Sequence, residues 1–166
     1  MALAVVRVRG MQQAGSRVQD TLHQLRLNRI NHLVFVKQSP NVKGMLEIVK
    51  DYVTWGEVSA EMIAKVLLNR GEAVGKRIKL SDDFIKSNNA KYKSIIALSK
   101  AIQADEASLS EVSNLQPVIR LHPPKGGYEN NKRSYASGGT LGYRGKDIEM
   151  LLEKMTVPLK GERFKW

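Results

Sequence analysis

Apolar and polar positions follow two different spacings near the start of the chain. Within the segment from Leu3 to Arg9, the basic residues 7 and 9 are interleaved with Val6 and Val8, which predicts a half-buried strand that Gly10 ends. Ser16 and Gln19 have the spacing of a capping box, and the apolar positions that follow recur every three or four residues. A strand followed by a helix is therefore expected.

Strand and helix patterns continue to alternate up to residue 58. Residues 32–37 and 53–58 are rich in β-branched and aromatic side chains and predict two more strands. Between them, Ser39 and Pro40 are the residue types favoured at a helix N-cap and at the first helical position, and an apolar stripe follows. This order predicts an α/β core in which helices cover one face of a small sheet.

The rest of the chain predicts a helical extension and then a long loop. Ser59 is expected to cap a helix, and residues 95–102 form another by composition. Residues 125–145 are rich in Gly, Tyr, Lys and Arg without an apolar period, so they predict a loop, after a short strand and before a last helix. We expect one domain over residues 1–166, consisting of the core 1–58, the helical extension 59–116 and the end segment 117–166.

The charge distribution points to a polyanionic partner. The net charge is +11 and the isoelectric point is near 10.0, which favours nucleic acid or an acidic membrane surface. The excess charge is +6 in residues 1–50, zero in 51–116 and +5 in 117–166, although chance clustering is the simpler alternative. No apolar run is long enough to span a bilayer and no secretion signal is present, so a cytosolic location is expected.

Catalytic and cofactor chemistry has little support in the sequence. The Gly-rich loop lacks the ending of a P-loop because Asp147 stands where Ser or Thr is needed, and its GxxG steps at 139–142 and 142–145 do not lie between two helices as in KH domains. We expect no enzyme activity, metal, cofactor or small-molecule substrate. The chain has no Cys, and none of its three histidines has metal-ligand spacing: His23, His32 and His122.

The loop at 125–145 has the composition of an RNA-contacting segment. Glycines let the backbone approach phosphates, basic side chains neutralise them, and tyrosine rings stack on unpaired bases. Such a loop is expected to be poorly ordered without its partner, and a flexible loop with no specific role is the alternative.

A second basic set belongs to the core. The alternation places Arg7 and Arg9 on the strand face opposite the apolar one, where they could meet RNA or only promote solubility. The set consists of Arg7, Arg9, Arg26, Arg29 and Lys43.

Five segments of the chain carry a family resemblance. They read RVRG at 7–10, VQDTLHQLRLNRINH at 18–32, KGMLEIVKDYVTWGEV at 43–58, RLHPPKGG at 120–127 and SGGTLGYRG at 137–145. In this order they resemble the L-thirty family of large-subunit ribosomal proteins, whose eukaryotic members are called L-seven. The resemblance covers about residues 3–155, and RINH and RLHPPKGG are its most specific parts.

The resemblance implies a ferredoxin-like α/β fold and a structural, non-enzymatic role in the large ribosomal subunit in the cytoplasm. Among the members of the family, the chain resembles the long archaeal form. The implied partners are large-subunit ribosomal RNA, 5S RNA and neighbouring ribosomal proteins. The chain departs from the family pattern at two places, which affects how the family's site residues are carried over. Ser137 stands where an acidic residue is expected, and residues 156–166 extend past the usual end of the family. The RNA-binding candidates carried over by position are Arg7, Arg9, Arg29, Asn31, His32, Lys43, Arg120, His122, Lys125, Gly126, Gly127, Tyr128, Lys132, Arg133, Tyr135, Gly138, Gly139 and Arg144.

Two other functions compete with the ribosomal one. A free RNA-binding translation or processing factor would bind isolated single-stranded RNA tightly and have an ordered loop. A small enzyme acting on a phosphorylated substrate would need a pocket with a carboxylate or histidine of perturbed pKa, and the sequence offers no such pair.

Overall fold

The computed structural model describes residues 2–12, 14–75, 80–88 and 91–156, so the predicted tail from 157 onward lies outside the described residues. The elements occur in the order β1 (Leu3–Arg7), α1 (Ser16–Gln24), β2 (His32–Val36), α2 (Pro40–Val49), β3 (Val53–Glu57), α3 (Ala60–Arg70), α4 (Asp82–Asn88), α5 (Ile95–Gln103), η1 (Leu109–Glu111), β4 (Ile119–Arg120), η2 (Tyr135–Ser137), β5 (Gly142–Tyr143), η3 (Gly145–Asp147) and α6 (Ile148–Thr156).

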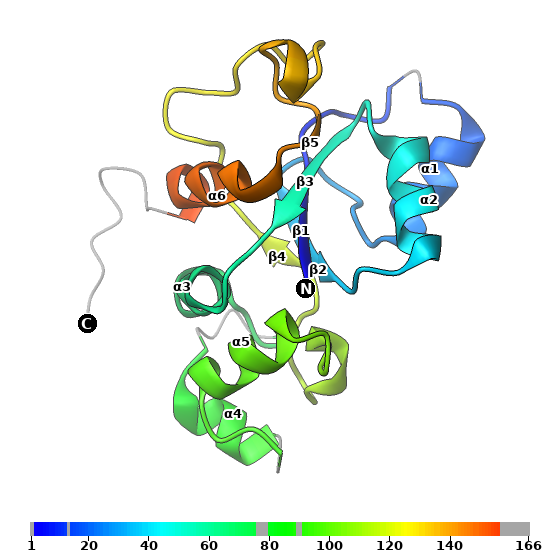
Figure 1. The fold of residues 1–166 in the computed structure, drawn as a ribbon. Coiled ribbons are helices and arrows are strands. Elements are labelled where there is room, and N and C mark those ends of the chain that lie inside the picture. Colours follow the sequence, from blue (N-terminus) through cyan, green and yellow to red (C-terminus); the bar gives the residue numbers. More distant parts are fainter. Residues whose placement is uncertain (1, 13, 76–79, 89–90, 157–166) are drawn as a thin grey trace.

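The strands form one five-stranded sheet in the order β4-β2-β1-β3-β5 (Figure 1). β1 lies at the centre and pairs antiparallel with β2 and β3, so that Val5 lies opposite Val34 on one side and Trp55 on the other. β4 adds antiparallel to β2, and β5 adds parallel to β3. The predicted α/β, ferredoxin-like arrangement is confirmed, and the end segment adds the two outer strands.

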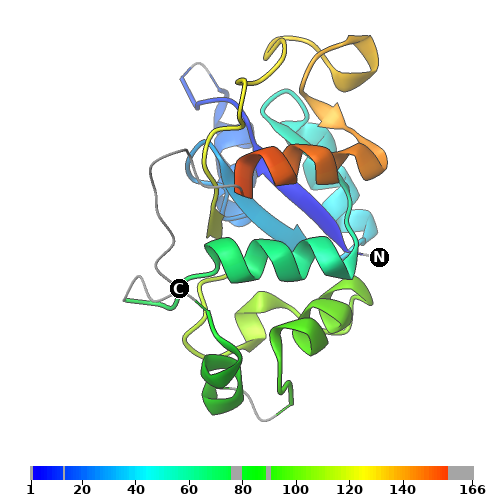
Figure 2. The same ribbon diagram turned by 90° about the vertical axis from the view of Figure 1, so that its left-hand side faces the viewer.

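Helices cover both faces of the sheet, so the prediction of one covered face is wrong. α1 and α2 pack on one face, while α6 and α3 lie side by side on the other with α5 next to α3 (Figures 1 and 2). Val5 belongs to the apolar cluster under α1 and α2, and Val6 belongs to the cluster under α3, α5 and α6. Every residue of β1 is buried because a central strand covered on both faces has no solvent side.

Two predicted helix caps are confirmed and one is wrong. Ser39 precedes α2 and Ser59 precedes α3, and each side chain accepts a hydrogen bond from the main-chain N–H three residues on. α1 is capped by Gly15 instead of Ser16, and the Gln19 amide donates to the carbonyl of the residue before that cap. Glycine is also accepted at N-caps, which explains why the serine is not needed there.

The predicted helical extension packs onto the sheet. Leu98 and Ile102 of α5 are buried in the same apolar cluster as Ala2, and the Ala2 N–H donates to the Gln103 carbonyl at 3.2 Å. Ser108 caps the short 3₁₀-helix η1. The extension therefore shares the core that lies under α3 and α6.

The segment predicted as an irregular loop, 125–145, contains short regular elements. η2 and β5 lie within it, the Tyr135 N–H donates to the Leu141 carbonyl at 2.7 Å, and the Thr140 hydroxyl donates to the Glu129 carbonyl at 2.9 Å. These bonds fold the segment back on itself. The segment is therefore not irregular over its whole length.

Candidate nucleic-acid interface

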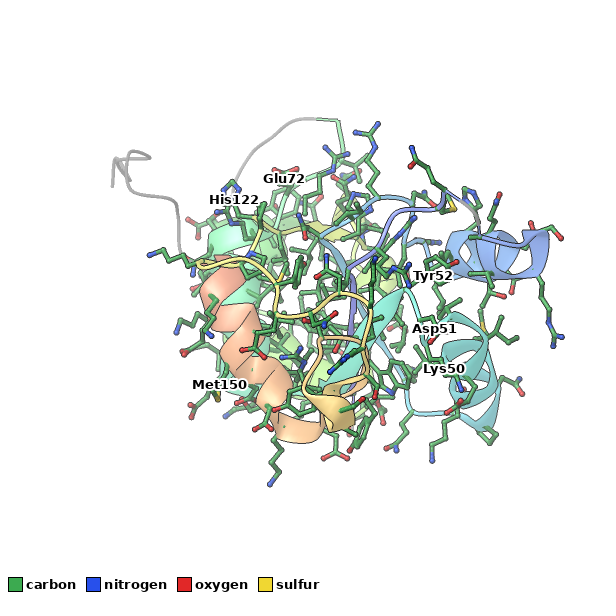
Figure 3. The ribbon with its side chains drawn as sticks, turned by 90° about the horizontal axis from the view of Figure 1, so that it is seen from above. Lys50, Asp51, Tyr52, Glu72, His122 and Met150 are labelled. Atoms are coloured by element: carbon green, nitrogen blue, oxygen red, sulfur yellow. The ribbon has the colours of Figure 1, made fainter. Side chains whose placement is uncertain are left out.

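One end of the sheet collects most of the predicted RNA-binding residues. β1 and β4 end there, while β2 and β3 begin there, because neighbouring strands in this part of the sheet are antiparallel. Seen from above this end, the loop of the end segment lies between His122 and Tyr52 (Figure 3). We call this region the basic end and define it by Arg9, Arg29, His32, Arg120, His122, Lys125, Lys132 and Arg133.

The longest cationic side chains of the basic end face solvent. Arg29, Arg120 and Arg133 are exposed, and none of them forms an ion pair within the described ranges. Arg9 lies beside them, with its guanidinium 5.4 Å from the centre of the Tyr52 ring and donating to the Asp51 carbonyl at 3.2 Å. Positive charge from separate segments is therefore concentrated without carboxylates paired to these three arginines, which suits a polyanion.

Arg7 does not belong to this surface, and its expected place on an open strand face is wrong. Its side chain is 2% exposed and lies on the face covered by α1 and α2. Nε donates to the Arg9 carbonyl at 2.9 Å, and Nη1 donates to the Leu27 carbonyl at 2.6 Å. Burial lowers the pKa of this guanidinium from its ordinary value. Arg7 therefore ties the end of β1 to the turn after α1.

Asn31 and Tyr128 hold the loop to the sheet. Asn31 has φ +63°, a left-handed conformation that asparagine tolerates better than most residues. Its N–H donates to the Arg7 carbonyl at 2.8 Å, its carbonyl accepts from the Leu121 N–H at 3.0 Å, and its side-chain oxygen accepts from the Tyr128 hydroxyl at 2.5 Å. Burial raises the pKa of Tyr128. Both residues thus connect β1, β4 and the loop beneath the basic end.

Removing the Tyr128 hydroxyl tests this connection. Tyr128→Phe is expected to lower the free energy of unfolding by about 1 kcal/mol, because the Asn31 side-chain oxygen loses its donor in a partly buried place. Urea unfolding measures the difference. Tyr143→Phe is the control, since Tyr143 is 55% exposed and its hydroxyl has only a 3.5 Å contact with Glu57. Equal losses in the two variants would contradict the role given to Tyr128.

His32 lies directly opposite Arg120 in the paired strands β2 and β4. Burial lowers the pKa of His32 below its ordinary value of 6.5, and the positive charges of Arg120, Arg29 and Arg7 lower it further. His32 is therefore neutral near pH 7 in the free chain. A phosphate bound beside the exposed Arg29 and Arg120 would oppose the charge effect and raise the His32 pKa.

The lowered pKa predicts opposite pH effects on folding and on RNA binding. The unfolded chain binds a proton at His32 more readily than the folded chain, so stability that is present above about pH 6.5 is lost as the pH falls from that value to the lower pKa of the folded chain. RNA binding is expected to strengthen over the same fall in pH, because bound phosphate favours protonated His32. His32→Gln should reduce both trends, measured by urea midpoints and RNA titrations at pH 5.5 and 7.5. Unchanged trends in the variant would assign them to other groups.

Arg144 and Tyr135 stabilise the loop from within. The Arg144 guanidinium lies 4.4 Å from the centre of the Tyr135 ring and donates to the Thr54 hydroxyl at 3.2 Å and to the Thr140 carbonyl at 3.1 Å. The Tyr135 hydroxyl donates to the Asp147 carboxylate at 2.7 Å, and this bond raises the pKa of Tyr135. Arg144 is partly buried, and burial lowers its pKa. Both predicted RNA-binding side chains have structural partners within the chain.

The predicted glycines divide into two groups. Gly139 is buried, and a Cβ at its position would collide with the Arg133 main chain, so this glycine allows two loop segments to lie close together. Gly126, Gly127 and Gly138 are exposed with φ between +77° and +85°, and a Cβ on any of them would have no neighbour within 4 Å. The exposed glycines leave open space at the basic end, whereas Gly139 supports the fold of the loop.

Lys43 is not brought to the basic end. It is exposed on α2 and lines a groove of about 540 Å³ together with Leu3, Trp55 and Tyr143. Leu3 begins β1, whereas the basic end lies where β1 finishes. Lys43 therefore belongs to the other end of the sheet.

Ile30 is a further candidate that the sequence predictions did not include. It is 46% exposed between Arg29 and Asn31, and the available signal was an isoleucine just outside the predicted strand. An exposed apolar side chain beside cations can pack on a ribose or a base.

Within the described ranges, no group of three or more His, Asp or Glu side chains is placed to hold a metal ion. The helices of the same ranges are too short or too polar to span a membrane.

Comparisons with known proteins give consistent matches. A family model described as ribosomal protein L30p/L7e matches residues 3–53. The chain is 44% identical over 151 residues to the large ribosomal subunit protein uL30 of Methanobrevibacter smithii, covering 91% of this chain and 97% of that protein. It is 45% identical to the uL30 proteins of Methanoregula boonei, with 92% and 98% covered, and Thermoplasma volcanium, with 97% and 98% covered. These alignments extend well past the family-model match.

Proposed function

The chain belongs to the uL30 family of large ribosomal subunit proteins, and on that premise we propose that its basic end binds large-subunit ribosomal RNA. As a member of this family, the chain is a structural, non-enzymatic component of the large ribosomal subunit, which works in the cytoplasm. The RNA contacts are inferred from the arrangement of charge.

The observation that carries the proposal is the convergence of exposed arginines at one end of the sheet. Arg29 precedes β2, and Arg120 closes β4 at the same end of the sheet. The Arg133 carbonyl accepts from the N–H of Leu141, just before β5 begins at that end. Solvation alone does not require cations from distant segments to converge, whereas a phosphate backbone favours it.

The arrangement separates side chains that contact RNA from those that support them. The exposed arginines and lysines neutralise phosphates, and Ile30 and the exposed glycines permit close approach to the sugar-phosphate backbone. Arg7, Tyr128 and Arg144 hold the strands and the loop in place by hydrogen bonds. Recognition is expected to depend mainly on RNA shape, because phosphate contacts carry little sequence information.

Salt dependence of binding tests the proposal at single residues. For Arg133→Ala, the slope of log binding constant against log salt concentration is expected to decrease by about 0.7 to 0.9, the effect of one lost phosphate contact. The probe is large-subunit ribosomal RNA freed of protein. The control is Lys93→Ala, because Lys93 is an exposed lysine of the helical extension. A slope unchanged by Arg133→Ala would remove the loop from the interface.

We further propose that 5S RNA is among the bound RNA segments. The resemblance of the RINH and RLHPPKGG segments to the family supports this finer assignment, and the two segments meet where His32 lies opposite Arg120. Large subunits are washed at rising salt on sucrose gradients, and the chain is followed beside 5S RNA. Retention of both at high salt, with loss of 5S RNA from subunits lacking the chain, is expected. Elution of the chain at the gradient top would favour a free RNA-binding factor.

A further inference from the structure

The outer edge of β2 is only partly covered. β4 pairs with His32 and Leu33, and the ladder stops at the pair Leu33–Ile119, although β2 continues to Val36. Continuing the same register would place Pro117 opposite Phe35. Proline has no N–H to donate, so the chain cannot extend this ladder in the usual way.

The direction of the main-chain groups follows from the alternation of an antiparallel ladder. The Trp55 carbonyl accepts from the Arg144 N–H on the β5 side, so Val5, opposite Trp55, directs its main-chain groups toward β2, and Val34, opposite Val5, directs its own toward β1. Odd-numbered residues of β2 therefore direct their N–H and C=O groups toward the β4 side. Phe35 and Lys37 have this parity. Among the described residues, no main-chain group bonds to either of them on the β4 side. The edge therefore offers donors and acceptors at the spacing of a strand.

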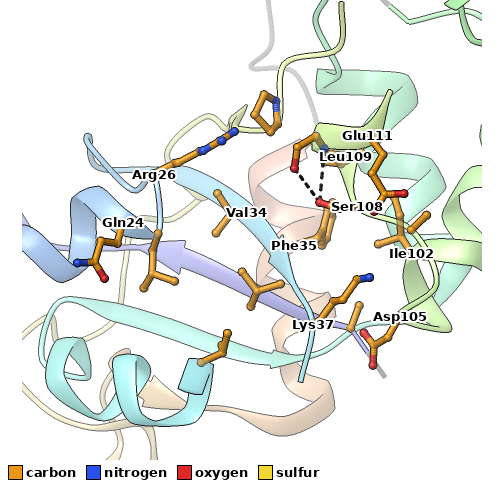
Figure 4. Close-up of a pocket in the computed structure, with 17 residues that line it drawn as sticks. Gln24, Arg26, Val34, Phe35, Lys37, Ile102, Asp105, Ser108, Leu109 and Glu111 are labelled. Atoms are coloured by element: carbon orange, nitrogen blue, oxygen red, sulfur yellow. Dashed lines mark hydrogen bonds between the residues drawn. The ribbon is translucent and has the colours of Figure 1, made fainter. Parts of the chain in front are cut away.

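A groove runs along this open edge. It has a volume of about 420 Å³, and Val34, Phe35 and Lys37 follow its length (Figure 4). Arg26 lies on one side, and Ser108 and Glu111 of the η1 region lie on the other. The groove thus combines an unpaired strand edge with partly apolar walls.

We propose that an extended segment of a neighbouring large-subunit protein occupies this groove and adds to β2 as a further strand. The main-chain groups of Phe35 and Lys37 pair with it, as in other cases of strand addition to an exposed edge. This inference rests on membership of the large subunit and does not depend on RNA binding at the basic end.

Charge favours a polypeptide over RNA as the occupant. The charged side chains that line the groove are balanced, two cations and two carboxylates, so the groove has no excess positive charge to attract a phosphate chain: Arg26, Lys37, Asp105 and Glu111. The segment 51–116, which supplies that wall, has no net charge. The matching segment is therefore extended, with apolar side chains toward the groove and a basic side chain facing Glu111.

Site-specific cross-linking tests the occupant. Because the chain has no Cys, Ser110→Cys can be labelled with a benzophenone and the labelled chain incorporated into large subunits lacking it. Irradiation is expected to couple the chain to one short segment of a single protein. Adding Lys37→Pro, which removes one edge N–H, should reduce the adduct about fivefold, whereas Lys37→Ala should not. Lys93→Cys with the same label serves as the control position.

Amide hydrogen exchange of the unmodified protein tests whether a strand adds to β2, and it does so even if Lys37→Pro fails to fold. In the peptide spanning 33–38, about two amides that exchange rapidly in the free chain should become protected in assembled subunits. An adduct confined to ribosomal RNA, or equal exchange of this peptide in the free and assembled states, would overturn the proposal. The salt-slope experiment reports separately on RNA binding at the basic end.

Discussion

Arg7→Met is expected to lower the free energy of unfolding by about 3 kcal/mol while leaving the salt dependence of RNA binding unchanged. Methionine fills part of the same space but cannot donate to the carbonyls of Arg9 and Leu27. Each hydrogen bond from a charged donor contributes about 1.5 kcal/mol or more, and the Leu27 acceptor is buried. Urea unfolding measures the loss, and RNA titrations under folding conditions measure the slope.

Arg120→Met is the matched comparison. Arg120 is exposed at the basic end, so its replacement should change stability by less than about 0.5 kcal/mol and reduce the salt slope by about 0.7 to 0.9. The two variants remove the same charge and are expected to differ in both readouts. A lower slope for Arg7→Met without loss of stability would show that Arg7 acts at the surface.

Gly56→Ala is expected to destabilise the chain by about 3 kcal/mol, at the upper end of ordinary overpacking effects. Gly56 lies in β3, and a Cβ there would collide with the Gly145 carbonyl and approach the Ile148 Cβ to 3.0 Å. Relief requires η3 and the start of α6 to move away from the sheet. Urea unfolding gives the energy, and faster amide exchange in α6 would locate the displacement.

Gly44→Ala should have the opposite sign. Gly44 lies within α2, and an added Cβ would find nothing within 4 Å. Alanine is favoured over glycine in a helix interior by about 0.8 kcal/mol, so the variant should be more stable than the parent. Destabilisation of similar size by both alanines would contradict the packing described at Gly56.

Local features of the fold were predictable from the sequence because their causes are local. Ser39 and Ser59 cap helices through hydrogen bonds three residues away, and the strand compositions at 32–37 and 53–58 gave correct elements. The burial of β1 on both faces depends instead on α6, which begins at Ile148. Alternation within one strand does not reveal what packs against it from so far along the chain.

The residues of the candidate site also divide into those that the sequence could predict and those that it could not. The basic residues around Arg29 and Arg120 were predicted by charge and position, and antiparallel pairing brings them together. Composition cannot distinguish a tyrosine that offers an open ring from Tyr128, whose hydroxyl binds Asn31. Lys43 was grouped with the others by its charge and by its place in the family resemblance, and the direction of α2 places it at the other end of the sheet.

The pairing of β3 with β5 joins distant parts of the chain: the Thr54 hydroxyl donates to the Gly142 carbonyl across 88 residues. During synthesis, strands β1 to β3 leave the ribosome long before this contact becomes possible. The nascent chain is therefore expected to pair β1 to β3 under α1 and α2 first, and to add the α6 side of the core and the last part of its cationic surface near the end of translation. This order of folding delays RNA binding by the incomplete nascent chain. It favours binding of the completed protein to an assembling large subunit.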